Sequence, residues 1–244
     1  MRVIVVLPAY NAAETLIHTY QEIPHDLVDE IILCDDSSSD HTVAVAREIG
    51  IDKVIIHPVN RGYGANQKTL YEAALESDAD IIIMLHPDYQ YNPALITSMI
   101  SLIEENVFDV VLGSRILGGG AILGGMPRYK YIANRFLTFL QNLLLGQKLS
   151  EYHTGYRAYH SKVLSSINYD ANSDDFIFDN QVLSQIIYLG FRIGEISCPA
   201  HYDEASSSIG FLHSVRYGFG VILVSLQHAM QKLKIKSNKR YLKY

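Results

Sequence analysis

Runs of apolar residues recur along the first half of the chain, and segments with the periodicity of a helix separate them. The runs are apolar at nearly every position, which is typical of strands whose two faces are both covered in a parallel sheet. The predicted strands span residues 3–7, 30–34, 53–57, 80–85 and 109–112. The predicted helices span residues 13–22, 41–49, 65–76 and 94–105. This alternation predicts an α/β fold with a doubly wound, mostly parallel sheet.

The pattern changes after Arg115. Residues 118–125 are rich in glycine, which predicts a mobile loop that closes over a site. A helix follows, with apolar side chains at Ile132, Phe136, Phe139, Leu140 and Leu143. We then expect a polar turn over residues 151–159, a helix near residues 180–189 and a strand over residues 192–202.

The last part of the chain contains an amphipathic stripe followed by basic residues. We expect one main domain over residues 1–205 and a helical appendage over residues 206–244. In the appendage, apolar residues recur at helical spacing at Val215, Phe219, Ile222, Leu223, Leu226, Met230 and Leu233. The basic residues that follow are Lys232, Lys234, Lys236, Lys239 and Arg240. This pattern suits a helix in the interface of an anionic membrane, and it equally suits a helix that packs on the main domain or forms an oligomer interface.

Composition narrows the possible functions. The chain has 244 residues, 48% of them hydrophobic, which is enough for a substantial core. Its net charge of −6 argues against a nucleic-acid partner. Two cysteines are too few for a disulfide framework, the first residues resemble a strand rather than a signal peptide, and no apolar run is long enough to span a membrane. We therefore expect a cytoplasmic protein, either free or peripheral at the cytoplasmic face of a membrane.

The fourth predicted strand ends in a polar turn that carries Asp88 and Gln90 one residue apart. Open α/β sheets bind ligands at the carboxyl ends of their strands, and oxygen ligands suit a hard divalent cation such as Mg²⁺ or Mn²⁺. The turn therefore predicts a metal ion that holds a phosphate. The alternative is that Asp88 only caps the helix that follows.

The first three strand ends indicate a nucleotide site. They carry the segments Pro8-Ala9-Tyr10-Asn11, Asp35-Asp36-Ser37-Ser38-Ser39-Asp40 and Asn60-Arg61-Gly62-Tyr63-Gly64. Together these offer an aromatic ring, two carboxylates and a glycine-flanked turn for a base, a ribose and a diphosphate. Neither a P-loop nor a dinucleotide fingerprint is present. In the alternative interpretation, Asp35 and Asp36 are bystanders to helix capping by Asp40.

Seven short motifs in order make the chain resemble an inverting family-2 glycosyltransferase of the GT-A type, close to the dolichyl- and polyprenyl-phosphate sugar synthases. They are PAYN, DDSSSD, NRGYGAN, HPDYQ, GSR, TGYR and FDN, between residues 8 and 180. The resemblance implies a GT-A catalytic domain over residues 1–205. It also implies that a UDP- or GDP-linked sugar is the donor and a polyprenyl phosphate is the acceptor.

The resemblance assigns roles to individual residues. It implies that the nucleotide is bound by Pro8, Tyr10, Asn11, Glu14, Asp35, Asp36, Asn60 and Gly64. It implies that Asp88 and Gln90 bind Mg²⁺ or Mn²⁺. His86 stands where the family has the first acid of the metal motif, which makes it a third candidate ligand and favours a softer ion such as Mn²⁺.

The resemblance also implies an acceptor site. Its candidate residues for the acceptor and the sugar are Arg115, Arg128, Glu151, Thr154 and Arg157. The guanidinium groups of the three arginines suit a phosphate, and Glu151 is a possible sugar contact. Arg157 has the alternative role of bracing the loop that shapes the site, and Asp179 is a further sugar contact or a helix cap. Asp88, Arg115, Arg128 and Asp179 form the predicted catalytic set.

Three functions follow, in order of preference. The first is in-line displacement by a polyprenyl phosphate with inversion, which needs no strong base because the phosphate is already ionised. The second is transfer to a saccharide hydroxyl in cell-surface polysaccharide synthesis, with Asp179 as the base. The third is nucleotide-sugar binding without catalysis, which the unusual His86 suggests.

Overall fold

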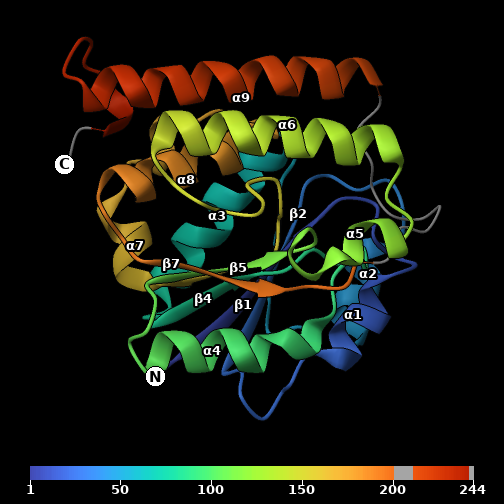
Figure 1. Cartoon of the computed structure of the whole chain (residues 1–244). Helices are drawn as coiled ribbons and strands as arrows, with labels where there is room; N and C mark the ends of the chain where they lie inside the picture. Colours follow the sequence, from blue (N-terminus) through green and yellow to red (C-terminus); the bar gives the residue numbers. More distant parts are fainter. Residues whose placement is uncertain (201–210, 242–244) are drawn as a thin grey trace.

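A seven-stranded sheet runs through the middle of the computed structural model, which describes residues 1–200 and 211–241 (Figure 1). The strands are β1 (Val3–Ala9), β2 (Glu30–Asp35), β3 (Lys53–Ile56), β4 (Ile81–Met84), β5 (Val110–Ser114), β6 (Arg157–His160) and β7 (Ile193–Ser197). Their order across the sheet is β3-β2-β1-β4-β6-β5-β7. All neighbouring pairs are parallel except the two that involve β6. The predicted doubly wound, mostly parallel sheet is therefore confirmed.

Helices cover both faces of the sheet. The α-helices are α1 (Leu16–Glu22), α2 (Thr42–Glu48), α3 (Tyr63–Glu76), α4 (Ile96–Glu104), α5 (Gly120–Leu123), α6 (Arg128–Leu145), α7 (Ser161–Ser166), α8 (Phe178–Tyr188) and α9 (Phe211–Lys232). Within residues 1–200 and 211–241, four short 3-10 helices accompany them: η1 (Pro93–Leu95), η2 (Leu117–Gly119), η3 (Tyr169–Ala171) and η4 (Lys239–Tyr241). The four helices predicted in the first half are present, with ends that shift by a few residues.

The continuous apolar runs feed two hydrophobic cores, one on each face of the sheet. In β1, Ile4 and Val6 point into the core beneath α3, α7 and α8, while Val5 and Leu7 point into the core beneath α1, α2 and α4. Successive side chains of a strand alternate between faces, so a strand that is covered on both faces needs apolar residues throughout. Burial of each such side chain contributes about 1.5–3 kcal/mol to folding.

The turn predicted over residues 151–159 is wrong at its C-terminal end, because residues 157–160 form β6. This strand pairs antiparallel with β4 and β5, and Arg157 lies opposite Met84 and Leu112. The arginine made the segment look like a surface turn, but it is completely buried and its donors are satisfied. Because β6 is antiparallel, its first residues lie at the edge where the parallel strands end.

The glycine-rich segment, predicted to be a mobile loop, contains helical turns, because residues 117–123 fold into η2 and α5. Two of its glycines permit close packing against the end of β7. A side-chain carbon on Gly118 would lie 2.5 Å from the Ser197 hydroxyl, and one on Gly124 would lie 1.7 Å from the Ala200 carbonyl oxygen. Close approach therefore explains these glycines, and the predicted mobility stays a prediction.

Helix α9 confirms the helix predicted at the C-terminus. It runs beside α6 in the same direction and also packs on α8 (Figure 1). Gly218 lies next to Leu137 of α6, and Gly220 allows close contact with Ile177 next to α8. The proposed domain boundary at residues 205 and 206 lies outside the described residues.

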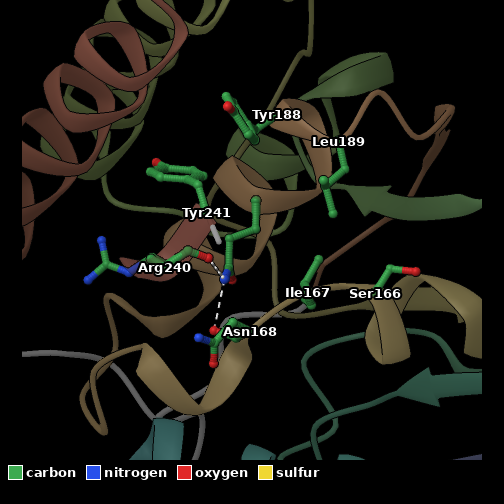
Figure 2. A pocket seen from close by; sticks show the side chains of 8 residues that line it. Ser166, Ile167, Asn168, Tyr188, Leu189, Arg240 and Tyr241 are labelled. Carbon is green, nitrogen blue, oxygen red and sulfur yellow. Dashed lines mark hydrogen bonds between the residues drawn. The ribbon is translucent and has the colours of Figure 1, made fainter. Parts of the chain in front are cut away.

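The C-terminal turn is also fixed to the main domain. Figure 2 shows the small pocket between η4 and α8, where Tyr241 lies near Tyr188 and Arg240 lies near Asn168. The amide of Gln185 donates to the backbone carbonyls of Arg240 and Asn168 at 2.7 and 2.8 Å. The C-terminal region is therefore part of the packed structure. None of the described helices is long and apolar enough to cross a membrane.

Candidate active site

A cavity of about 550 Å³ lies at the edge where the parallel strands end. Ten of the residues predicted from the sequence line it: Pro8, Tyr10, Asn11, Asp36, Asn60, His86, Asp88, Gln90, Arg115 and Asp179. Seven do not line it: Glu14, Asp35, Gly64, Arg128, Glu151, Thr154 and Arg157. The structure thus brings the motifs to one place and divides their residues into those that face the cavity and those behind it.

Asp36, just after β2, fixes the segment that follows β3. One of its carboxylate oxygens accepts from His57 Nδ1 at 2.7 Å and from the Arg61 amide at 2.9 Å. The other accepts from the Gly62 amide at 2.8 Å. These contacts rule out a bystander role for Asp36, because its carboxylate shapes the turn that lines the cavity.

The ends of β1 and β2 are joined through Asn11. Its backbone has a left-handed conformation, with φ of 51°, and its side-chain oxygen accepts from the Ser39 amide at 2.8 Å. Asp35 is buried and does not line the cavity, and one of its oxygens accepts from the Ser38 amide at 2.9 Å. Its other oxygen is buried and makes no hydrogen bond within the described part of the chain. Tyr10 is exposed and available to stack on a planar ligand.

The glycines after β3 are required by packing. A side-chain carbon on Gly62 would lie 2.6 Å from the Asp174 carbonyl oxygen, and one on Gly64 would lie 2.4 Å from the Ser173 carbonyl oxygen. The Gly64 amide also donates to the Asp174 carbonyl at 2.8 Å. Gly64 therefore holds α3 against the segment before α8 and makes no part of the cavity wall.

The turn after β4 places three candidate metal ligands on the cavity wall: His86, Asp88 and Gln90. The backbone N–H of Gln90 donates to Asp88 Oδ1 at 3.1 Å, and Tyr89 between them has a φ of 56°. Within residues 1–200 and 211–241, no three His, Cys, Asp or Glu side chains cluster as a metal site. A cation here would therefore take few protein ligands and complete its shell with water and substrate oxygens, as Mg²⁺ commonly does.

Tyr63 links His86 to Asp179. Its hydroxyl donates to Asp179 Oδ2 at 2.8 Å and lies 2.9 Å from His86 Nε2. Burial raises the pKa of Tyr63 well above its usual value and lowers the pKa of His86, so the tyrosine stays protonated and the imidazole stays neutral. Since the only hydroxyl proton goes to Asp179, His86 Nε2 carries a proton and donates to Tyr63. This leaves Nδ1 as the unprotonated nitrogen, the form that ligates metals.

Arg115 and Glu151 form a buried ion pair behind the turn that follows β4. Besides the contact between the two charged groups, the Arg115 amide donates to Glu151 Oε2 at 2.8 Å and Asn134 donates to Oε1 at 2.9 Å. Burial alone would raise the pKa of Glu151, but the Arg115 guanidinium and amide hold it below its usual value. Arg115 also donates to Gln90 Oε1 at 3.3 Å, which orients a candidate metal ligand.

Arg157 has the bracing role. It is completely buried and donates to the carbonyls of Thr154, Asp179 and Tyr152 at 2.9, 2.9 and 3.1 Å. Its guanidinium also pairs with Asp179 Oδ1 at 3.6 Å, and Gln67 donates to the same oxygen at 3.2 Å. The structure therefore supports the interpretation in which Arg157 supports the site from behind.

Several cavity residues escaped the sequence analysis, most notably Lys130, His153 and Tyr217. Lys130 faces the cavity, whereas Arg128 is exposed at the start of α6 and does not line it. His153 Nδ1 lies 2.8 Å from the Tyr217 hydroxyl of α9, and burial lowers the pKa of His153 to about 4. The sequence could have indicated Lys130, because it lies on the other side of the α6 helix from the apolar residues Ile132, Phe136 and Phe139. Nothing in the sequence around His153 indicated its position.

The chain is similar in sequence to several glycosyltransferases. It is 26% identical to UDP-N-acetylglucosamine–dolichyl-phosphate N-acetylglucosaminyltransferase of Methanococcus voltae, over 93% of this chain and 96% of that protein. It is 25% identical to polyprenol monophosphomannose synthase of Mycolicibacterium smegmatis, over 80% of this chain and 76% of that protein.

The fold also matches that of a solved enzyme. Glucosyl-3-phosphoglycerate synthase from Mycobacterium tuberculosis in complex with UDP superposes with a TM-score of 0.73 at 18% identity, over 93% of this chain and 80% of that one. Other structures of that enzyme contain Mn²⁺ with UDP-glucose, or Mg²⁺ with UDP. The expected GT-A fold is confirmed. The model of the family described as glycosyl transferase family 2 matches residues 4–167, and the chain therefore belongs to that family of glycosyltransferases.

Proposed function

We propose that this glycosyltransferase moves a sugar from a nucleotide-sugar donor to a polyprenyl phosphate, with inversion and with the help of a divalent cation. The observation that carries the proposal is the composition of the cavity wall. The strand ends contribute Asp36, Asp88 and Gln90, while α6 contributes Lys130 and the apolar Leu137. The cavity thus has a polar region that suits a nucleoside diphosphate and a second region where the Lys130 ammonium lies beside apolar surface. The second region suits a phosphate attached to a hydrocarbon chain.

Asp88 and Gln90 would hold the cation, and His86 Nδ1 would be a third ligand. The donor set fits Mg²⁺ or Mn²⁺ because two oxygens and a neutral imidazole face one cavity, and the imidazole shifts the preference toward Mn²⁺. When bound, such an ion stabilises the negative charge that develops on the leaving diphosphate. Arg115 keeps the Gln90 side chain in place through the hydrogen bond to Oε1.

The hydrogen bonds of Asp179 favour a phosphate acceptor. Tyr63 and Gln67 donate to its two oxygens, and Arg157 pairs with one of them. A general base would have to give up these contacts to take a proton from a sugar hydroxyl. A phosphate oxygen is already ionised at neutral pH, so positioning and charge neutralisation suffice. In our proposal Asp179 orients Tyr63, and Lys130 faces the acceptor phosphate.

Relatives with lipid-phosphate acceptors in their names support this choice. They are the dolichyl-phosphate and polyprenol transferases described above. A lipid acceptor places the protein at a membrane surface, and we propose a peripheral location at the cytoplasmic face.

A transfer assay tests the function. The purified chain is given UDP- and GDP-linked hexoses, each with a polyprenyl phosphate or a soluble saccharide as acceptor, with Mn²⁺, Mg²⁺ or EDTA. We expect transfer to the lipid phosphate with one nucleotide class, loss in EDTA, and an inverted anomeric configuration by NMR. Transfer to the saccharide alone would establish the second function considered above. Donor binding by calorimetry without transfer to any acceptor would indicate a binding protein.

A further inference from the structure

Helices α6 and α9 carry apolar stripes that point away from the rest of the protein. We call these side chains the outer face: Tyr129, Ile132, Phe136, Phe139 and Leu143 of α6, and Val215, Phe219, Leu223 and Leu226 of α9. Their spacing of three or four residues places each set along one side of its helix. Buried residues such as Asn134 and Thr138 of α6, and Val221 and Val224 of α9, occupy the opposite side.

The outer face is unusually exposed for such large apolar side chains. Phe136, Phe139 and Leu143 are 58, 64 and 69% exposed, and Phe219 is 71% exposed. Single exposed apolar residues are common on proteins, but a continuous group usually marks a binding surface. Helices α6 and α9 lie side by side (Figure 1). Because each stripe lies opposite the buried side of its helix, the two stripes belong to one outer surface.

The charge of these helices is opposite to that of the whole chain. The chain has 26 acidic residues against 20 basic ones, yet residues 116–150 and 205–244 contain no Asp or Glu. Exposed basic residues accompany the outer face: Arg128, Arg135, Arg216, Lys232 and Lys234. An apolar stripe with cations beside it matches an interface between hydrocarbon and anionic headgroups.

The same helices form a wall of the cavity. Lys130 and Leu137 of α6, and Tyr217 of α9, line it from positions beside the outer face. A surface in contact with the outer face would therefore lie next to the side of the cavity where the proposed function places the acceptor.

We propose that the outer face lies on the surface of an anionic bilayer and brings the cavity to the lipid phosphate. This inference rests on the proposed function and names the surface that serves it. A second copy of the chain fits less well, because its basic residues would be brought against those of the first without any acidic partner from these helices.

The first test uses the full chain with paired substitutions. The double variant, Phe136→Glu with Phe219→Glu, places charges on both stripes without altering cavity residues. Val59→Glu is the matched control, at a position that is 63% exposed in the loop after β3. Removal of α9 is unsuitable because it would expose its packing surface on α6 and α8. Binding is measured by co-sedimentation with vesicles of phosphatidylcholine alone and with added phosphatidylglycerol.

We expect the wild type and Val59→Glu to bind vesicles with phosphatidylglycerol, and the double variant to bind at least tenfold less. Lys232→Gln with Lys234→Gln should weaken binding to anionic vesicles several-fold and reduce its salt dependence. Equal binding by the wild type and the double variant, or no binding by the wild type, would overturn the inference. So would a wild-type dimer in light scattering that the double variant converts to monomers without any vesicle binding.

A second readout separates this inference from the proposed function. With a short-chain polyprenyl phosphate that dissolves in water, the double variant should transfer sugar at the wild-type rate. With a long-chain polyprenyl phosphate in vesicles, its transfer rate should fall by the same factor as its vesicle binding. Failure of the wild type with both acceptors would contradict the proposed function. Slow transfer by the double variant in both would show that the substitutions damage the site, and the surface assignment would then be rejected.

Discussion

The two sides of the cavity are built differently. The strand-end side consists of short segments that follow β1, β2, β3 and β4, and polar contacts join neighbouring segments, such as Asp36 to the Gly62 amide and Asn11 to Ser39. The helix side consists of α6, α9 and residues 151–155, and it depends on contacts between distant parts of the chain. Arg115 with Glu151 and His153 with Tyr217 are examples.

This difference teaches where function and stability can be separated. On the strand-end side, the residues at the tips of strands are supported by a sheet that folds without them. On the helix side, the polar residues that shape the cavity also hold the elements together. Substitutions on the strand-end side should therefore impair transfer and leave folding intact, whereas substitutions on the helix side should affect both.

The largest effect is expected from Glu151→Ala, which leaves the buried Arg115 guanidinium without its partner. Loss of one member of a buried ion pair typically costs about 3–5 kcal/mol in the free energy of unfolding. Urea denaturation measures this cost, and transfer should fall with it because Arg115 also orients Gln90. Removing both charges in Arg115→Met with Glu151→Leu should destabilise the fold less than Glu151→Ala alone. Equal losses in the two variants would mean that the unpaired charge is not the cause.

The strand-end side is tested by Asp88→Ala. If Asp88 ligates the ion, transfer should fall by more than a hundredfold, equivalent to about 3 kcal/mol in the barrier, with an unchanged melting temperature. Asp175→Ala is the control, since Asp175 is an exposed carboxylate that also lines the cavity. Its activity should stay within a few-fold of the wild type. Retention of more than about a tenth of the wild-type rate by Asp88→Ala would remove Asp88 from the metal role.

Sequence reasoning succeeded where the signal is local. Continuous apolar runs identified the strands of the sheet, and polar residues at their ends located the cavity, because strand ends of a parallel sheet meet at one edge. It failed at β6, because a buried arginine with satisfied donors looks like a surface residue in sequence. It also could not show that Gly64 and Gly118 are needed for close packing, because their contacts are with Ser173 and Ser197 far away in the chain.

The helix side has a pH dependence of its own, which His153 causes. Burial lowers the pKa of His153 from 6.5 to about 4, so the unfolded chain binds a proton more readily than the folded one between these values. Stability from His153 is thus complete above pH 6.5 and is lost as the pH falls toward 4. Between pH 7 and 5 the loss should be about 1–2 kcal/mol.

His153→Gln isolates this contribution, because glutamine can keep a hydrogen bond to Tyr217 and does not titrate. The free energy of unfolding of wild type and variant is compared from pH 7 to pH 5. The wild type should lose more stability over this range, and the two curves should run in parallel above pH 7. Parallel curves throughout would show that His153 does not titrate differently in the folded protein.

The smallest effect concerns the segment of η2 and α5, which adjoins the helix side. Gly118 and Gly124 pack closely on the end of β7, yet the segment precedes α6 and Met126, which lines the cavity. If it closes over bound substrates, hydrogen exchange of its amides should slow a few-fold when nucleotide, metal and lipid phosphate are present together. The amides of α4, on the opposite face of the sheet, serve as the internal reference and should not change.

Gly124→Ala should speed exchange in the segment with and without ligands, because its new methyl group would meet the Ala200 carbonyl oxygen. Exchange that is unaffected by the three ligands together would mean that the glycines serve packing alone, and that the segment is a fixed part of the wall.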